Sequence, residues 1–162
     1  MNTAYLLIGG NLGNRLANLQ KAIEAIEENC GDVIAISSVY ETAAWGNTDQ
    51  PSFLNQVIVL HTDMQPSILM KELLGIEERL GRLRQEKMGP RTIDIDILLI
   101  DDQIIHEENL TIPHPSLHLR KFALIPLAEV AAAKIHPTIK KTIAELLTDC
   151  PDTLAVNKIS WL

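Results

Sequence analysis

The sequence contains little that would mark a disulfide-stabilised, metal-finger or membrane protein. Its two cysteines, Cys30 and Cys150, cannot supply the ligand set of a metal finger, and one pair is too few to suggest a disulfide scaffold. No apolar run approaches the ~20 residues that a helix needs to cross a bilayer. The opening residues, from Met1 to Tyr5, lack the basic segment of a signal peptide. We therefore expect a reduced protein of the cytoplasm that does not enter a membrane.

Positive charge and aromatic side chains are also scarce. The chain has 14 Lys and Arg against 21 Asp and Glu, a formal net charge of −7, and only 4% of its residues are aromatic. General binding to nucleic acids or anionic membranes needs a basic surface, because much of the affinity comes from counterion release. The charge balance therefore argues against both kinds of partner.

The composition that remains is that of an ordinary globular protein. The chain has 162 residues, of which 46% are hydrophobic and 22% charged. A chain of this length is large enough to bury one core, and it shows no internal repeat or low-complexity linker. We expect a single domain over residues 1–162.

The hydrophobic periodicity predicts an α+β fold. Apolar and β-branched runs predict strands, and apolar residues at helical spacing predict helices between them. In chain order these are strand Ala4–Ile8, helix Arg15–Asn29, strands Val33–Tyr40 and Phe53–Thr62, a helix from Pro66 to Leu80, and strand Thr92–Ile100.

This βαββαβ order is typical of a ferredoxin-like core, an antiparallel sheet with helices packed on one face. Two polar segments, Glu41–Ser52 and Arg82–Pro90, are predicted to be loops, and loops of this length are usually functional. The last ~60 residues are expected to extend the same domain, with a short strand near Ile105, proline-containing turns and a weak helix over Thr142–Leu147.

The strand that ends the predicted core contains two aspartates separated by one residue. Side chains alternate across a strand, so Asp94 and Asp96 share one face while the neighbouring isoleucines share the other. One interpretation is an amphipathic strand with two solvated acids. Aspartate is, however, depleted in strands, and two carboxylates about 7 Å apart suit hard cations. The pair by itself leaves both interpretations open.

Basic residues lie on both sides of this aspartate pair. This cluster of basic residues stands out because the chain is acidic overall. It is either a solvated basic loop or the charge arrangement that phosphoryl transfer requires. The basic residues are Arg82, Arg84, Lys87 and Arg91 before the pair and Arg120 and Lys121 after it.

Other phosphate-binding and catalytic motifs are absent. The sequence has no Walker P-loop, no zinc-protease motif and no serine-hydrolase elbow. Gly9-Gly10-Asn11-Leu12-Gly13 has a superficial likeness to a dinucleotide turn, but Ile8 occupies a position where that motif needs glycine. His114, held between two prolines, is either a turn residue or a positioned phosphate contact.

Several of these segments together resemble one family of the folate pathway, 6-hydroxymethyl-7,8-dihydropterin pyrophosphokinase. Lys87–Leu98, which reads KMGPRTIDIDIL, carries the strongest resemblance. Further matching segments occur in the family's order, from about Ala4 to Pro137. They are Leu7–Gly13, Tyr40–Thr42, Phe53–Asn55, Glu77 with Gly81–Arg84, Thr111–Pro115 and Arg120–Phe122.

The resemblance implies an enzyme that transfers pyrophosphate from ATP to the hydroxymethyl group of 6-hydroxymethyl-7,8-dihydropterin, giving AMP and the pterin pyrophosphate. It implies two Mg²⁺ ions held by Asp94 and Asp96, and Arg82 and Arg91 as catalytic contacts to the phosphates. The remaining implied contacts divide between the two substrates. ATP is expected to contact Glu77, Arg84, Ile97, Thr111, His114 and Arg120. The pterin is expected to contact Thr42, Trp45, Phe53, Asn55 and Phe122.

The chain departs from the family pattern at a few positions, which bear on nucleotide affinity and loop closure more than on the reaction. These are Met88, Ala43, Ala44, Leu74 and Asn109.

Two other hypotheses use the same fold. A non-catalytic ferredoxin-like module that binds a ligand or a partner protein would explain the topology but not the arginines beside the aspartate pair. An RNA-binding domain would need aromatic residues on its strands, and Val33–Tyr40 and Phe53–Thr62 do not show that pattern. We expect a monomer by default.

Overall fold

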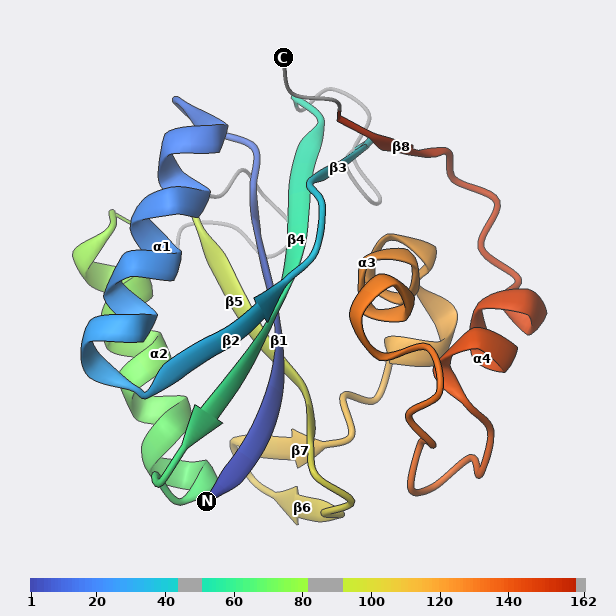
Figure 1. The fold of residues 1–162 in the computed structure, drawn as a ribbon. Helices are drawn as coiled ribbons and strands as arrows, with labels where there is room; N and C mark the ends of the chain where they lie inside the picture. The colour runs from blue at the N-terminus through green and yellow to red at the C-terminus, as the bar shows by residue number, and fades with distance from the viewer. Residues whose placement is uncertain (44–50, 82–91, 160–162) are drawn as a thin grey trace.

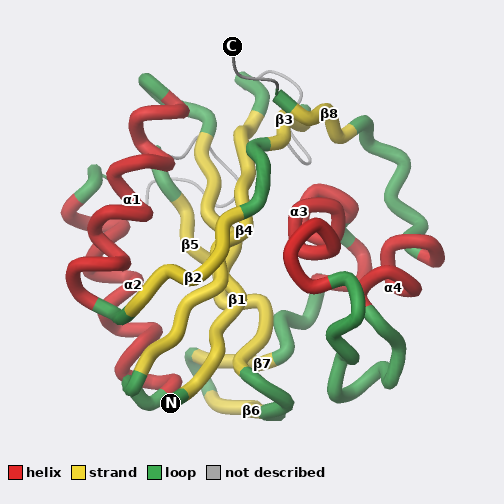
Figure 2. Tube along the Cα trace, viewed as in Figure 1, coloured by secondary structure: helices red, strands yellow, loops and turns green. Residues whose placement is uncertain are grey.

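A six-stranded antiparallel sheet forms the centre of the molecule (Figures 1 and 2). The computed structural model describes residues 1–43, 51–81 and 92–159. The strand order of the sheet is β5-β1-β4-β3-β8, and β2 pairs with β4 beside β3. These strands are β1 (Asn2–Gly10), β2 (Asp32–Ile36), β3 (Tyr40–Thr42), β4 (Phe53–Thr62), β5 (Asp94–Ile100) and β8 (Val156–Lys158).

Two helices cover one face of the sheet, α1 (Arg15–Asn29) and α2 (Pro66–Arg79). The Asn14 side chain caps α1 by accepting a hydrogen bond from the Ala17 N–H at 3.1 Å, and Pro66 occupies the first turn of α2. The apolar stripes of both helices pack on alternate residues of the strands, each fully buried Leu or Ile contributing about 1.5–3 kcal/mol. This part of the chain confirms the predicted ferredoxin-like βαββαβ core.

The opposite face is covered by α3 (Lys121–Ala131) and α4 (Ile143–Asp149). The expectation of helices on one face therefore holds for α1 and α2 alone. Proline-containing turns occur as predicted at Pro113, Pro115 and Pro137, but the helix α3 was not predicted. Pro126 lies inside α3 and removes one backbone hydrogen bond, at a cost of about 3 kcal/mol. Burial of Ala123, Leu124 and Leu127 against the sheet offsets this cost.

The other elements differ from the predictions mainly at their ends. The expected strand Val33–Tyr40 is divided into β2 and β3, because Ser37 and Ser38 interrupt the ladder with side-chain hydrogen bonds. A hairpin of β6 (Ile105–Glu107) and β7 (Leu110–Ile112) follows β5, and a 3₁₀ turn, Leu117–Leu119, precedes α3. Thr142 and Glu145 form a capping box that begins α4. In the described part of the chain no helix could span a membrane.

Candidate functional site

Four residues form a row across the sheet at the end where β1 finishes. Gly9 pairs with Asp94 of β5 on one side and with Asn55 of β4 on the other, and Asn55 pairs with Tyr40 of β3. The Tyr40 hydroxyl donates to Glu129 of α3 at 2.6 Å, which identifies the face of the sheet on which the row's side chains lie. Residues far apart in the sequence thus meet on the α3 face of the sheet.

Gly9 leaves the space that the Asn55 amide occupies. A Cβ atom at position 9 would lie 2.3 Å from Asn55 Oδ1 and 2.9 Å from the Leu54 carbonyl oxygen. Asn55 is 5% exposed. The amide, which offers one acceptor and two donors, therefore lies over the glycine in the row that leads to Asp94.

Asp94 and Asp96 lie on this same face of β5, as the alternation predicted. Both are half-buried, whereas Ile93, Ile95 and Ile97 are buried in the core on the α1 and α2 side. Across the described ranges no group of three or more His, Cys, Asp and Glu could hold a metal ion. A pair of carboxylates without nitrogen or sulfur ligands fits Mg²⁺, which takes one or two carboxylates and completes its shell with water and substrate phosphates.

Glu77 lies against the outer edge of β5 at the centre of the aspartate pair. It is 1% exposed, and its Oε2 accepts the Ile95 N–H at 2.6 Å. Alternate residues of a strand direct their N–H groups to the same side, so the Ile97 N–H points to this edge as well. Because the Ile97 side chain is in the core, any ligand contact of Ile97 involves its backbone.

His114 follows β7, and the charges of Arg120 and Asp94 both act on its pKa. Burial, and then the nearby Arg120 guanidinium, lower the pKa of His114 to about 4, against the opposing influence of Asp94. The imidazole is therefore neutral at pH 7. Its Nδ1 accepts the Ser116 N–H at 3.1 Å, which leaves the proton on Nε2 as a donor. Thr111, two residues before the buried Pro113, is half-buried on β7, which contacts β5.

The aromatic candidates lie on the same side of the sheet. Phe53 begins β4 and pairs with the buried Thr42 of β3, two positions along each strand from Asn55 and Tyr40. Phe122 lies in the first turn of α3, half-buried, with the Arg120 guanidinium 5.7 Å from its ring centroid. This separation is within the range of a cation–π contact.

Some predicted residues fall outside the described part of the chain. They are Trp45, Arg82, Arg84 and Arg91, together with the departures Ala44 and Met88. Of the other departures, Ala43 and Asn109 are exposed and Leu74 is half-buried on α2.

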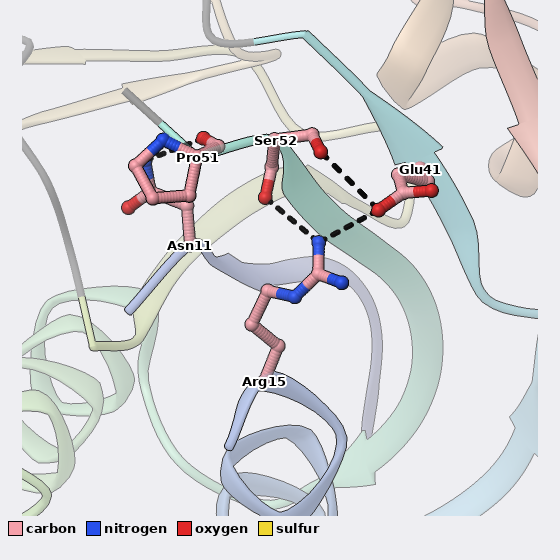
Figure 3. Close-up of polar contacts among 5 residues, drawn as sticks. All are labelled: Asn11, Arg15, Glu41, Pro51 and Ser52. Carbon is pink, nitrogen blue, oxygen red and sulfur yellow. Dashed lines mark hydrogen bonds and ion pairs between the residues drawn. The ribbon is translucent and has the colours of Figure 1, made fainter. Parts of the chain in front are cut away.

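A polar cluster that the sequence did not reveal holds the ends of β3 and β4 together (Figure 3). The Arg15 guanidinium, at the start of α1, pairs with Glu41 Oε2 at 2.7 Å and donates to the Ser52 carbonyl oxygen at 3.0 Å. The Ser52 hydroxyl also donates to Glu41, and the Asn11 amide donates to the Pro51 carbonyl at 3.0 Å. The contacts of Arg15 and Asn11 join residues 26 to 40 positions apart, so no local spacing could have indicated them. They fix the backbone next to Thr42 and Phe53.

We expect the Arg15–Glu41 pair to contribute a small, pH-dependent stability. The Arg15 hydrogen bond holds the pKa of Glu41 below its usual value. A lowered carboxyl pKa stabilises the fold above the unfolded-state pKa, about 4.3, and the contribution is lost as pH falls through the folded-state value. The side chains are 31% and 37% exposed, so solvent screening limits the coupling to about 0.5 kcal/mol.

A double-mutant cycle with Arg15→Ala and Glu41→Ala, measured by urea unfolding, tests this expectation. The coupling free energy should be present at pH 7 and disappear in acid. A coupling that stays constant over that range would contradict the assigned ion pair.

Comparisons of the sequence with known proteins match it to one family. The family model of 7,8-dihydro-6-hydroxymethylpterin-pyrophosphokinase matches residues 5–132. The chain belongs to this family. A 2-amino-4-hydroxy-6-hydroxymethyldihydropteridine pyrophosphokinase of Aquifex aeolicus is 42% identical over 90% of this chain and 90% of its own length. The Synechocystis protein of the same name is 41% identical over 91% of this chain and 76% of its own length. The pyrophosphokinase hypothesis is thus supported over the non-catalytic module.

Solved structures show the same fold in longer proteins. A Plasmodium falciparum structure titled HPPK-DHPS superposes with a TM-score of 0.75 at 20% identity, over 92% of this chain. The chain spans 43% of that structure's chain. At this identity the likeness establishes the fold alone.

Proposed function

We propose that the chain transfers the pyrophosphoryl group of ATP to the hydroxymethyl oxygen of 6-hydroxymethyl-7,8-dihydropterin, releasing AMP and forming the pterin pyrophosphate. The row Asp94–Gly9–Asn55 carries the proposal, because it joins a carboxylate pair to a buried amide on one face of the sheet. A phosphoryl donor and a polar heterocycle need these two kinds of group side by side. Family membership supports the same reaction.

Asp94 and Asp96 are the residues that would hold the Mg²⁺ ions, two in this proposal. Bound there, Mg²⁺ supplies positive charge to the phosphate oxygens and to the attacking oxygen. Ile95 lies between the two aspartates, and its hydrogen bond to Glu77 fixes the backbone from which both carboxylates project. The chain thus presents the carboxylates on a fixed strand, which limits the reorganisation needed when the substrates bind.

The pterin site is assigned to the α3 face of the sheet. The ring would lie between Phe53 and Phe122, gaining about 0.5–1.5 kcal/mol from each aromatic contact beyond area burial. The Asn55 amide would donate to and accept from the pterin's polar edge. Backbone groups near Thr42 and Trp45 would complete the polar contacts of the ring.

The triphosphate site is assigned to the residues around β7 and the start of α3. The His114 Nε2–H and the Arg120 guanidinium would donate to phosphate oxygens, with Arg84 beside them. Since His114 is neutral at pH 7, its contribution is a hydrogen bond and not a charge. Arg82 and Arg91 would stabilise the charge that develops on the transferred group. Glu77, Thr111 and the Ile97 backbone would border the nucleoside.

The chain accelerates the reaction chiefly by alignment and electrostatic stabilisation. Transfer requires the hydroxymethyl oxygen to be in line with the β-phosphorus, and holding two substrates in that geometry removes much of the entropic barrier. We assign no strong general base. The proposal takes the enzyme to be a cytoplasmic monomer, one domain over residues 1–162, with ATP and the pterin as partners and no nucleic acid.

Phosphorus-31 NMR of the products tests the proposal. With ATP, MgCl₂ and the hydroxymethyl dihydropterin, we expect AMP and a pterin diphosphate as the only new phosphorus species. Formation of ADP and a pterin monophosphate would show phosphoryl transfer instead. Unchanged ATP, with a folded protein that still binds the pterin, would favour the non-catalytic module.

A further inference from the structure

The segment that follows α4 contacts both sides of the proposed pterin site. It runs from the end of α4 past α3 to β8, which lies beside β3 (Figure 1). Val156 of β8 pairs with Thr42, and the Ile159 N–H donates to the Val39 carbonyl at 2.9 Å. Near its start the same segment bonds to α3 through Asp152. It is therefore bonded to the strand and to the helix that carry pterin contacts in our proposal.

Asp152 supplies the N-terminal cap that α3 lacks. Arg120, at the N-cap position, makes no side-chain capping hydrogen bond. The first helical N–H, that of Lys121, donates instead to Asp152 Oδ2 at 3.0 Å, although the two residues are 31 positions apart. The Leu154 N–H donates to Asp152 Oδ1 at 3.0 Å and holds the carboxylate in place. An anionic acceptor at a helix N-terminus also interacts favourably with the helix dipole.

The capped turn carries two proposed substrate contacts. Arg120 and Phe122 flank Lys121, and the Arg120 guanidinium lies over the Phe122 ring. A shift of the Lys121 backbone therefore moves a phosphate-binding group and a pterin-stacking ring together. The far end of α3 is held separately, because the Glu129 carboxylate accepts from the Tyr40 hydroxyl and from the Ser38 N–H at 2.8 Å. Loss of the Asp152 cap should thus loosen the first turn without detaching the helix.

From this arrangement we infer that Asp152 is a positioning residue for pterin binding, acting through the backbone of Lys121 on Arg120 and Phe122. The inference rests on the proposed function. It gives the C-terminal segment a role in the site, since that segment sets where the start of α3 lies relative to β3.

The test compares Asp152→Ala and Asp152→Asn with a matched control, Asp149→Ala. Asp149 is an exposed carboxylate of α4 that pairs with Lys141 at 2.8 Å. For each variant we would measure the thermal midpoint, the KM for pterin and for ATP, kcat, and the equilibrium Kd for pterin with a non-hydrolysable ATP analogue.

Asp152→Ala is expected to raise the Kd and KM for pterin about tenfold, the size of a lost cap, while kcat changes less than threefold. Asp152→Asn keeps an acceptor oxygen but loses the charge, so its Kd and KM for pterin should lie between those of the alanine variant and the wild type. Asp149→Ala should leave all five quantities as in the wild type.

A lowered thermal midpoint with an unchanged pterin Kd would overturn the inference, because it would show a purely structural cap. An equal loss in Asp149→Ala would overturn it too. Failure of the proposed function has a different signature, since the wild-type protein itself would then release no pterin-dependent AMP.

Discussion

Replacing either aspartate of β5 with asparagine is expected to reduce kcat by about a thousandfold or more, the largest effect of any single substitution considered. Asparagine keeps the shape of Asp94 or Asp96 and removes the negative charge that would hold Mg²⁺. The protein should still fold, because asparagine keeps the volume of the half-buried carboxylate and one of its acceptor oxygens. Turnover should fall while the protein stays folded, as checked by its thermal unfolding transition.

Asp102→Asn is the matched control for these variants. Asp102 follows the same strand but is exposed and pairs with Lys134 at 2.8 Å. Steady-state kinetics over a range of MgCl₂ concentrations should show wild-type turnover for this variant. Full activity in Asp94→Asn or Asp96→Asn would show that the metal assignment is wrong.

Gly9→Ala is expected to weaken pterin binding by about 10- to 100-fold, the range of one or two lost hydrogen bonds. The added methyl group would lie 2.3 Å from Asn55 Oδ1, so the amide must leave its position. The Leu54 carbonyl oxygen, 2.9 Å from the same methyl group, adds a clash with the β4 backbone and a loss of stability. Fluorescence titration with pterin and urea unfolding would measure the two effects separately.

A second substitution separates the two consequences of that methyl group. In an Asn55→Ala background the clash with the amide no longer exists, so Gly9→Ala should cost stability but little further pterin affinity. Gly75→Ala on α2 serves as a control, because its nearest contact is the flexible end of Arg79 at 3.3 Å and alanine favours a helix. Additive losses of pterin affinity at positions 9 and 55 would contradict the proposed contact between them.

The parts of the fold that the sequence predicted are those with strong local patterns. The helix Arg15–Asn29 and the strand Phe53–Thr62 agree with the structure at both ends. The helix has a 3.6-residue apolar period with a cap, and the strand contains the apolar, β-branched run Val57–Leu60. The helix α3 could not be predicted in this way. Its Pro126 indicates a break, and the helix owes its stability to burial against the sheet, a tertiary effect.

In the candidate site, too, the features with a local sequence pattern could be predicted and those that depend on long-range contacts could not. Asp94 and Asp96 stand out because charged residues alternate with isoleucines in a strand, and the structure places them on one face as expected. The contacts around them depend on strand register and on long-range pairing. Neither the space that Gly9 leaves for Asn55 nor the Asp152 cap on Lys121 has a signal in local spacing, because each joins residues more than 30 positions apart.

The measurement that tests the account most directly is AMP release from ATP by the Mg²⁺-loaded protein, with and without 6-hydroxymethyl-7,8-dihydropterin. Binding of both substrates is needed to align the pterin hydroxyl with the β-phosphorus, so AMP should appear only when the pterin is present. Its amount should equal that of the pterin pyrophosphate formed. AMP release that does not depend on the pterin, or no AMP from a folded protein with both substrates, would contradict the assignment of a pterin pyrophosphokinase.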